Sequence, residues 1–327
     1  MIKRTILVTG GTGFIGAYLV RRLVGDGHVV RVVDNDLRGS KARLNSVISN
    51  ISLIDCDCRD ADAMTAAANG CDTIIHLAAL NGTENFYKRP ELVLDVGIRG
   101  MFGALEAARR NGIEKFVLAS SSEVYQTPPV VPTSENVPMM IPDPWNPRYS
   151  YGGSKLISEI MLANYNRDVL KQAVIFRPHN VYAPDMGFEH VIPQLALRAA
   201  QQIARHPTGN VPFEIQGDGT QTRSFIQIED FIDGLMLVVE KGEHRNVYHI
   251  GTEEEISILQ LVNLIFAWFG RQPEIISTPA PEGGTPRRCP DITKLVKLGF
   301  VPKVDIKSGI AEATAWYANF AKHNVVS

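Results

Sequence analysis

The sequence predicts an α/β fold in which a doubly wound parallel sheet is followed by a smaller, discontinuous C-terminal lobe. Short apolar strands alternate with helical patterns over the first 180 residues, which is typical of βαβ units. A glycine-rich stretch, Thr9–Gly16, lies between the first strand and the first helix. That is where a sheet of the Rossmann type binds a nucleotide. The alternation breaks down after about residue 180, which indicates the smaller lobe.

The glycine-rich stretch predicts a pyrophosphate site. Gly10, Gly13 and Gly16 follow the buried strand Thr5–Val8 and open a helix. Glycines at this point let the backbone turn tightly, present N–H groups to a pyrophosphate and let helix and strand approach closely. The N-terminus of the helix adds a partial positive charge aimed at the same anion.

Asp34 predicts which dinucleotide binds. It ends the second strand, Val29–Val33, where a carboxylate accepts hydrogen bonds from the adenosine ribose hydroxyls and repels a 2′-phosphate. We therefore expect NAD as the cofactor, while Arg38 nearby leaves NADP open. A tight turn without a ligand is the less favoured interpretation.

Composition excludes several classes of function. The chain has 327 residues and a net charge of −2, so it has no general attraction for nucleic acid or an anionic membrane. No apolar run is long enough to cross a bilayer, and Met1–Arg4 lacks signal-peptide character, so we expect a cytoplasmic protein with no nucleic-acid or membrane partner. The four cysteines, Cys56, Cys58, Cys71 and Cys289, predict free thiols, and no metal site is expected.

Local periodicity predicts the remaining elements. Further strands are expected over residues 51–54, 72–79, 116–119, 174–176, 213–215, 225–227 and 247–250, the last returning to the main sheet. Helices are expected over 42–48, from near residue 60, and over 90–110, 149–166, 191–204, 230–239, 258–269 and 306–320, with a Pro-rich loop over 127–147. Residues 1–180, with a return segment near 225–250, are thus expected to form the dinucleotide-binding domain. Residues 181–327 are expected to form most of the substrate lobe.

Three side chains predict a site for hydride transfer. Tyr151 and Lys155 lie one helical turn apart, so both face the same side of a helix. A tyrosine has an ordinary pKa near ~10, but an ammonium and an oxidised nicotinamide beside it lower that pKa, because positive charge favours the phenolate. Ser121 follows the fifth strand and is expected to hold the substrate hydroxyl that Tyr151 deprotonates. His76 is expected to be packed in the fold rather than catalytic.

Together these motifs resemble an extended short-chain dehydrogenase/reductase of the NAD-dependent nucleotide-sugar epimerase/dehydratase family. The matching pieces are Gly10-x-x-Gly13-x-x-Gly16, Asp34, His76-Leu77-Ala78-Ala79, Ser120–Tyr125, Tyr151-x-x-x-Lys155 and Arg177–Asn180. The expected cofactor-binding residues are Gly10, Gly13, Phe14, Ile15, Gly16, Asp34, Asp57, Leu77, Ala78, Ala79, Tyr151 and Lys155. For Asp57, two roles stay open: it reaches the adenine amino group, or it caps the helix that starts near Asp60.

The resemblance also implies the catalytic and substrate-binding residues. The expected catalytic residues are Ser121, Tyr151, Lys155 and Glu123, and the expected substrate contacts are Ser122, Asn180, Arg223 and Arg288, with Arg287 as an alternative to Arg288. Asn180 is expected to touch the sugar or its phosphates, and the arginine fork suits a diphosphate. The substrate implied is a nucleotide-diphosphate sugar that is oxidised at C4 to a ketone.

Members of this family differ in the fate of the ketone. Dehydratases that this chain resembles carry an Asp-Glu pair after the catalytic Ser or Thr, and here Ser122 replaces the acid. We therefore expect an epimerase rather than a 4,6-dehydratase. Ser121-Ser122-Glu123 and the run Pro286–Lys294 are closer to uronate decarboxylases, which makes that activity the second choice. The segment Asn81-Gly82-Thr83-Glu84 matches neither branch, and Gly97 replaces an asparagine of many members.

The resemblance further implies a homodimer. The helices 90–110 and 151–166 correspond to those that form a four-helix dimer interface in the family, so we expect two copies of the chain to associate through them. A dinucleotide-binding protein without catalysis is the remote alternative to an enzyme, because a fold alone does not establish activity.

Overall fold

A seven-stranded parallel sheet lies at the centre of the structure, a computed structural model that describes residues 3–279 and 285–323. In spatial order its strands are β11 (Asn246–Ile250), β6 (Gln172–Pro178), β5 (Lys115–Ala119), β4 (Thr73–His76), β1 (Thr5–Thr9), β2 (Val29–Asp34) and β3 (Ile51–Asp55). The strand order reverses between β1 and β4, and a ligand crevice forms at such a switch point. The predicted doubly wound sheet and its returning last strand are confirmed.

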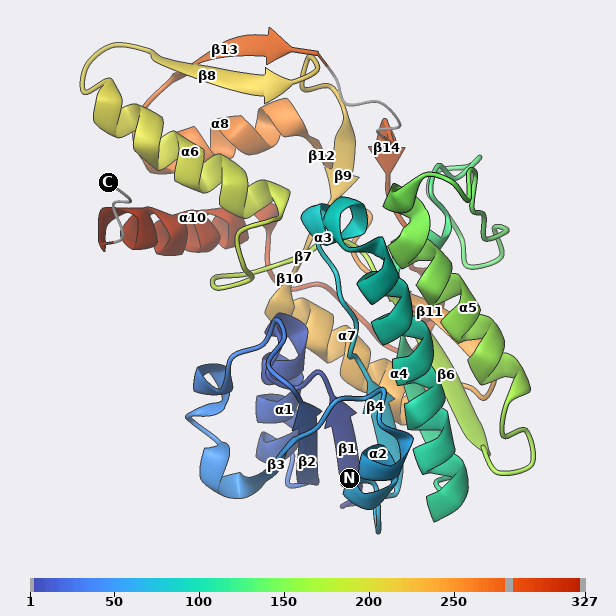
Figure 1. The fold of residues 1–327 in the computed structure, drawn as a ribbon. Coiled ribbons are helices and arrows are strands. Elements are labelled where there is room, and N and C mark those ends of the chain that lie inside the picture. The colour runs from blue at the N-terminus through green and yellow to red at the C-terminus, as the bar shows by residue number, and fades with distance from the viewer. Residues whose placement is uncertain (1–2, 280–284, 324–327) are drawn as a thin grey trace.

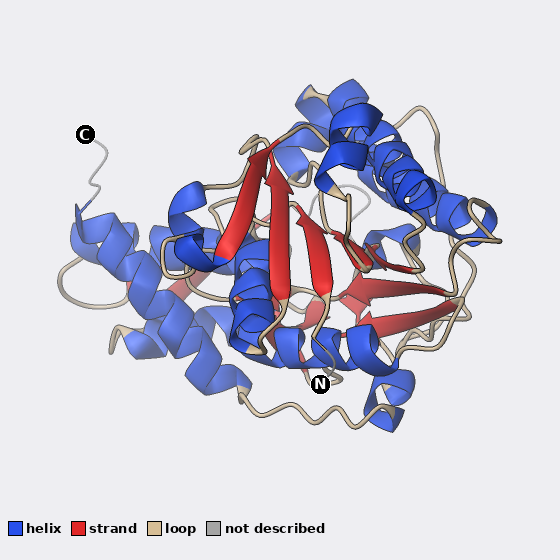
Figure 2. Ribbon diagram, turned by 90° about the horizontal axis from the view of Figure 1, so that it is seen from below, coloured by secondary structure: helices blue, strands red, loops and turns tan. Residues whose placement is uncertain are grey.

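Helices cover both faces of this sheet (Figures 1 and 2). One face carries α1 (Phe14–Gly25) and α7 (Ile228–Lys241), and the other carries α2 (Ala61–Ala67), α4 (Pro90–Asn111) and α5 (Ser150–Asn164). Successive side chains of β1 point to opposite faces, so Ile6 and Val8 join the core under α1 while Leu7 joins the core under α4. Burial on both faces explains why the central strands read as continuous apolar runs.

The C-terminal lobe has its own hydrophobic core and lies beyond the carboxyl ends of the strands (Figure 1). Its helices are α6 (Val191–Arg205), α8 (Ile258–Trp268) and α10 (Ile306–His323). Its strand pairs are β8 (Val211–Gln216) with β13 (Pro273–Thr278), and β9 (Thr222–Ser224) between β12 (Glu255–Ser257) and β14 (Arg287–Arg288). Short β7 (Val181–Tyr182) pairs with β10 (Ile226–Gln227), and α9 (Thr293–Lys297) packs near β11.

Local structure departs from the sequence prediction after β2. The helix expected over residues 42–48 is wrong: two short 3₁₀ turns, Lys41–Leu44 and Ile48–Asn50, stand in its place. Asn, Ser and β-branched Val at positions 45–47 are weak helix formers, and only Leu44 in these turns is buried. The strand expected over 225–227 is confirmed as the shorter β10, and the sequence predicted neither β9 nor the short helix α3 (Thr83–Lys88).

Gly97 has a packing role. A Cβ at this position of α4 would lie 2.7 Å from the side chain of Ser154 on α5, which is closer than atoms can pack without a shift. Glycine in place of the asparagine therefore lets α4 pack closely against α5, the helix that carries Lys155.

All four cysteines are free, as predicted, and the structure buries them. Among the described residues, the helices are too short or too polar to span a membrane.

Candidate active site

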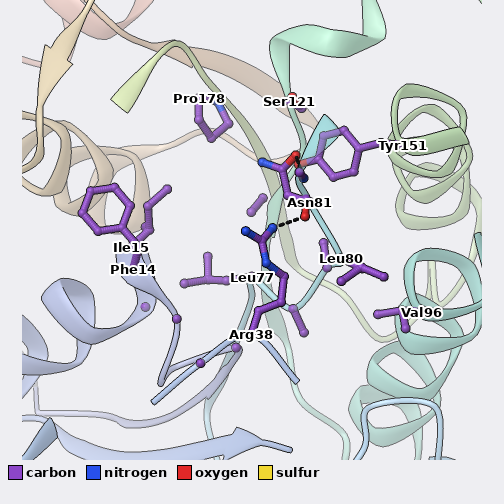
Figure 3. Close-up of a pocket in the computed structure, with 18 of the residues that line it drawn as sticks. Phe14, Ile15, Arg38, Leu77, Leu80, Asn81, Val96, Ser121, Tyr151 and Pro178 are labelled. Atoms are coloured by element: carbon purple, nitrogen blue, oxygen red, sulfur yellow. Dashed lines mark hydrogen bonds between the residues drawn. The ribbon is translucent and has the colours of Figure 1, made fainter. Parts of the chain in front are cut away.

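A cavity of about 450 Å³ opens at the carboxyl ends of the central strands. It brings together residues that the sequence places far apart, and Figure 3 shows Phe14 and Ile15 facing Ser121 and Tyr151 across it. The predicted site residues among its lining are Gly10, Gly13, Phe14, Ile15, Gly16, Asp34, Asp57, Leu77, Ala78, Ala79, Ser121, Ser122, Glu123, Tyr151, Lys155, Asn180 and Arg288. Arg223 is not among them.

The glycine turn has the geometry of a pyrophosphate cradle. Gly10 has a φ of 72°, and a Cβ there would lie 2.9 Å from the backbone nitrogen of Ala78. A Cβ on Gly16 would collide with the carbonyl oxygen of Gly10. The N-terminus of α1 is capped by Gly13 without a side-chain hydrogen bond, which leaves its first N–H groups available to an anion.

Asp34 is fixed at the end of β2 by backbone N–H groups of the glycine turn and of the loop after β2. Its carboxylate accepts hydrogen bonds from the N–H of Thr12 over 3.0 Å and of Asp36 over 2.9 Å. The carboxylate lines the same cavity as the glycine turn. These two features fit the adenosine diphosphate part of NAD, with the ribose on Asp34 and the pyrophosphate on the turn.

Asp57 is not a helix cap. Asp60 caps α2 instead, accepting from the N–H groups of Asp62 and Ala63, because the helix begins at Ala61 and Asp57 lies too far upstream. Asp57 lines the cavity and accepts hydrogen bonds from Arg59 and Asn35. The hydrogen bond from Arg59 holds the pKa of Asp57 below its ordinary value. The adenine-contacting role is therefore the one that stays a prediction.

The predicted catalytic residues converge on one end of the cavity. Ser121 follows β5, and its side chain lies near enough to Tyr151 of α5 to act on the pKa of that phenol. The ammonium of Lys155 donates to the carbonyl oxygen of Ala119 over 2.7 Å and lies 5.8 Å from the centroid of the Tyr151 ring. One turn of α5 and the end of β5 thus place all three functional groups together.

In the protein alone the pKa of Tyr151 is raised, and the lowering expected from Lys155 together with an oxidised nicotinamide stays a prediction. Burial raises the pKa of Tyr151 to about 12, and the nearby Ser121 hydroxyl only partly opposes it. Burial also lowers the pKa of Lys155 to about 8. A buried phenol loses the hydration that its anion needs, and this cost exceeds the lowering by Ser121 and by the positive charge of Arg38.

Glu123 forms an ion pair at the cavity wall. Its carboxylate accepts from Nη1 of Arg288 over 2.5 Å. Burial acts to raise the pKa of Glu123, but the positive charges of Arg288, Arg148 and Arg223 together bring it below its ordinary value. The side-chain Nε of Arg288 is buried without a partner among the described residues.

The remaining substrate candidates lie on the C-terminal side. Asn180 has a φ of 40° and donates from Nδ2 to the carbonyl oxygen of Ser224 over 2.7 Å. Arg223 donates to the carbonyl oxygens of Thr222 and Thr285, each over 2.7 Å. A substrate role for Arg223 stays a prediction, since its guanidinium lies outside the cavity lining.

His76 is packed, as predicted. It is 2% exposed, and its Nδ1 lies 2.8 Å from the hydroxyl of Thr9. That hydroxyl accepts from the N–H groups of Leu77 and Ala78, so its own proton points to the imidazole. His76 therefore holds the β4 end in place beneath the cavity.

Sequence reasoning missed two contacts of the site. Arg38 crosses the cavity to the carbonyl oxygen of Asn81 (Figure 3) and pairs with Glu189 of the other lobe over 3.1 Å. Phe86 of α3 stacks on Tyr151. Neither contact leaves a signal in the sequence, because each joins segments that are distant along the chain.

A Rossmann sheet whose nucleotide crevice ends at a serine and a Tyr-x-x-x-Lys helix defines an enzyme of the short-chain dehydrogenase/reductase class. The profile of the "NAD dependent epimerase/dehydratase family" matches residues 6–251. The chain belongs to this family, and its predicted cofactor, NAD, is confirmed at the level of the family.

Relatives within the family carry several activities. The chain is 33% identical to a putative UDP-glucose 4-epimerase of Methanocaldococcus jannaschii, over 96% of this chain and 98% of that protein. It is 30% identical to a UDP-N-acetyl-alpha-D-glucosaminuronate decarboxylase of Bacillus cytotoxicus, over 97% of this chain and 98% of that one. The structure of DesIV, a dTDP-glucose 4,6-dehydratase of Streptomyces venezuelae with NAD and TYD bound, superposes with a TM-score of 0.84, covering 98% of each chain at 26% identity.

Proposed function

We propose that the protein is a nucleotide-diphosphate-sugar epimerase that works through a transient ketone at C4 of the sugar. The observation that carries this proposal is the meeting of Tyr151, Ser121 and Lys155 at one end of the cavity, with Ser122 rather than an acid next to Glu123. Tyr151, Ser121 and Lys155 suit the removal of hydrogen from an alcohol. The pair Ser122-Glu123 lacks the acid that would protonate a departing hydroxyl, which disfavours 4,6-dehydration.

Each residue then has a stated task. Tyr151 takes the proton of the C4 hydroxyl, and Ser121 holds that oxygen by hydrogen bonding. NAD, when bound, would supply the acceptor for the hydride of C4, and its oxidised, cationic ring would favour the phenolate. Lys155 holds α5 against β5 through Ala119. Epimerisation would be completed by rotation of the ketone within the cavity and return of the hydride from the reduced cofactor to the other face of C4.

The two lobes bind different ligands in this proposal. Residues 1–180, with the return segment near 225–250, hold NAD, and residues 181–327 mostly hold the sugar nucleotide. Asn180 and Arg288 contact the sugar and its diphosphate, since both line the cavity, and the positive charge of Arg223 acts on Glu123 at the cavity wall. The M. jannaschii relative, a putative UDP-glucose 4-epimerase, supports the choice of reaction.

Decarboxylation of a nucleotide-diphosphate uronate is the second candidate. The ion pair of Glu123 with Arg288 favours it, since three arginines act on this corner of the cavity and suit a sugar carboxylate. The B. cytotoxicus relative is a decarboxylase of a uronate. The reaction would use the same C4 ketone, after which the carboxylate leaves as carbon dioxide.

Product analysis distinguishes the candidates. We expect purified protein with NAD to convert one member of a panel of UDP-, dTDP-, GDP- and CDP-sugars to its epimer, detected by NMR. Carbon dioxide evolved from UDP-glucuronate would replace the epimerase by the decarboxylase, and a 4-keto-6-deoxy sugar would establish the dehydratase. A Tyr151→Phe variant that binds NAD and retains turnover would contradict the role of Tyr151.

We also propose a homodimer built on α4 and α5. These helices, with the residue after α5, expose apolar side chains in the single chain, namely Leu94, Phe102, Ile157, Ile160 and Tyr165. Phe102 and Tyr165 meet edge to face with ring centroids 6.3 Å apart. Two such faces from two copies would cover these side chains in a four-helix arrangement.

A further inference from the structure

The helix α3 begins within the stretch 81–84, which matches neither branch of the family. We propose that Phe86 of this helix is a positioning residue for Tyr151: it lies flat on the phenol ring, directs the hydroxyl to Ser121 and keeps water from that face. The inference rests on the proposed function only through the catalytic role of Tyr151.

The geometry of the pair is specific. The ring centroids of Phe86 and Tyr151 lie 5.2 Å apart with an interplanar angle of 13°, an offset-stacked arrangement. The two residues are 7% and 8% exposed, and both line the cavity. A stacked ring restricts rotation of the phenol about χ1 and χ2, whereas an aliphatic side chain would leave that motion open.

Phe86 is itself held in place by the polar residues around it. Asn85, which is 6% exposed, donates from Nδ2 to the carbonyl oxygen of Asn81 over 2.9 Å. Nη2 of Arg89 donates to Oδ1 of Asn85 over 2.6 Å. Gly82 has a φ of 113°, which lets the chain turn directly into α3. These contacts fix the short helix to the loop after β4, so the ring of Phe86 cannot drift from Tyr151.

The charged groups around Tyr151 lie on elements other than α3. Lys155 lies on the same helix, Glu123 on the turn after β5 and Arg38 on the loop after β2. The face of Tyr151 toward α3 meets the apolar ring instead. An aromatic face carries partial negative charge and excludes water, so Phe86 disfavours the phenolate while it fixes the orientation of the hydroxyl.

Removal of Phe86 should therefore change two properties in opposite directions, phenolate formation and turnover, which loss of structure alone would not do. Without the ring, water reaches the phenol, and the phenolate forms at lower pH. The hydroxyl also loses its fixed direction, so turnover falls even though the phenolate forms more readily. A purely structural residue would lower turnover without moving the titration of Tyr151.

The test compares Phe86→Ala and Phe86→Leu with Tyr87→Ala, which removes the adjacent ring of the same helix, itself 50% exposed. Tyr151 is titrated in the NAD-bound protein by phenolate absorbance in the near ultraviolet, as the difference from the matching variant with Tyr151→Phe. Turnover is followed across the same pH range. Thermal melting checks that each variant is folded.

For Phe86→Ala we expect about a tenfold larger phenolate fraction at a fixed pH below the titration midpoint, equivalent to about one pH unit. We also expect kcat to fall by about 10- to 100-fold with KM changed less than about threefold. Phe86→Leu keeps water out, so it should lower kcat with a smaller change in the titration, and Tyr87→Ala should match the wild type.

A titration of Tyr151 in folded Phe86→Ala that coincides with the wild type would overturn the proposal, as would an equal shift in Tyr87→Ala. The absorbance titration needs no substrate. Failure to turn over any sugar nucleotide would therefore count against the proposed function, whereas an unmoved titration would count against the role of Phe86.

Discussion

The ammonium of Lys155 donates a 2.7 Å hydrogen bond to the backbone carbonyl of Ala119. Ala119 ends β5, two residues before Ser121, and Lys155 lies one turn of α5 after Tyr151. A single buried contact therefore ties the strand that carries the serine to the helix that carries the tyrosine. The catalytic geometry depends on this tie as much as on charge.

Replacement of Lys155 by Met should lower kcat by about 100-fold or more, the range lost when acid–base machinery is disrupted. The carbonyl of Ala119 would be left buried without its partner, at about 1–3 kcal/mol of stability. Lys155→Arg should not restore activity, because a planar fork cannot replace a compact ammonium in a site this enclosed. Turnover and urea unfolding of both variants check these expectations. Full activity in Lys155→Met would contradict them.

The buried ion pair of Glu159 and Arg177 should dominate stability beneath the site. Its two side chains are 4% and 3% exposed, with Nη2 and Oε2 separated by 2.6 Å, and Glu159 also bonds the hydroxyl of Ser120. Glu159→Gln leaves the guanidinium uncompensated and should lower the free energy of unfolding by about 3–5 kcal/mol.

The matched control for that variant is Glu84→Gln, which breaks an exposed pair with Lys88 whose side chains are 58% and 72% exposed. It should change the free energy of unfolding by less than about 1 kcal/mol. Equal effects of the two variants in urea unfolding would show that the buried pair has no special role.

Three buried histidines should make the free energy of unfolding fall with pH, beginning at a pH higher than that at which carboxylates titrate. His76, His179 and His249 are at most 2% exposed. Burial lowers the pKa of His76 and His249 to about 3, and that of His179 well below its ordinary value. The unfolded chain binds protons at these groups below about pH 6.5 and the folded protein does not, so stability is complete above about pH 6.5 and is lost as the pH falls.

The expected slope is about 4 kcal/mol per pH unit well below pH 6.5, from about 1.4 kcal/mol for each histidine. Urea unfolding at about pH 7.5, 6.5, 5.5 and 5.0 measures it, and His76→Gln should reduce the slope by about one third. A free energy of unfolding that stays constant over this range would show that these histidines accept protons in the folded state.

If the dimer forms as proposed, charged side chains introduced on the α4–α5 face should convert the protein to a monomer. Phe102, 43% exposed, and Ile160, 49% exposed, lie on the α4–α5 face. Phe102→Glu with Ile160→Glu should halve the mass measured by light scattering, because burying unpaired carboxylates is costly. Val301→Glu, at a residue 69% exposed, serves as the control and should leave the mass unchanged. A wild-type protein of monomer mass would remove the dimer.

Local patterns explain most of the features that the sequence could predict. The glycine turn, Asp34 at a strand end and the one-turn spacing of Tyr151 and Lys155 each need only neighbours in the chain, and all of them line the cavity. The returning strand β11 was also predictable, because its apolar run matched a buried strand.

Long-range contacts explain the features that could not be predicted. Arg38 meets Glu189, and Phe86 meets Tyr151, only after the two lobes and the short helix α3 are placed. The raised pKa of Tyr151 likewise results from burial, which the spacing of Tyr151 and Lys155 does not reveal. The 3₁₀ turn Lys41–Leu44 was missed for a different reason. Its local helical pattern is weak, and long-range side-chain contacts such as that of Arg43 with Asp185 help to determine its conformation.

In the proposed reaction, Tyr151 deprotonates a sugar alcohol while the C4 hydrogen moves as hydride to NAD and back. Sugar nucleotide deuterated at C4 tests this most directly, with the product isolated and examined by mass spectrometry and NMR. We predict that the product retains deuterium at C4, that turnover shows a primary isotope effect, and that Tyr151→Phe forms no product while still binding NAD. Loss of deuterium to water, or equal product formation by Tyr151→Phe, would contradict the mechanism.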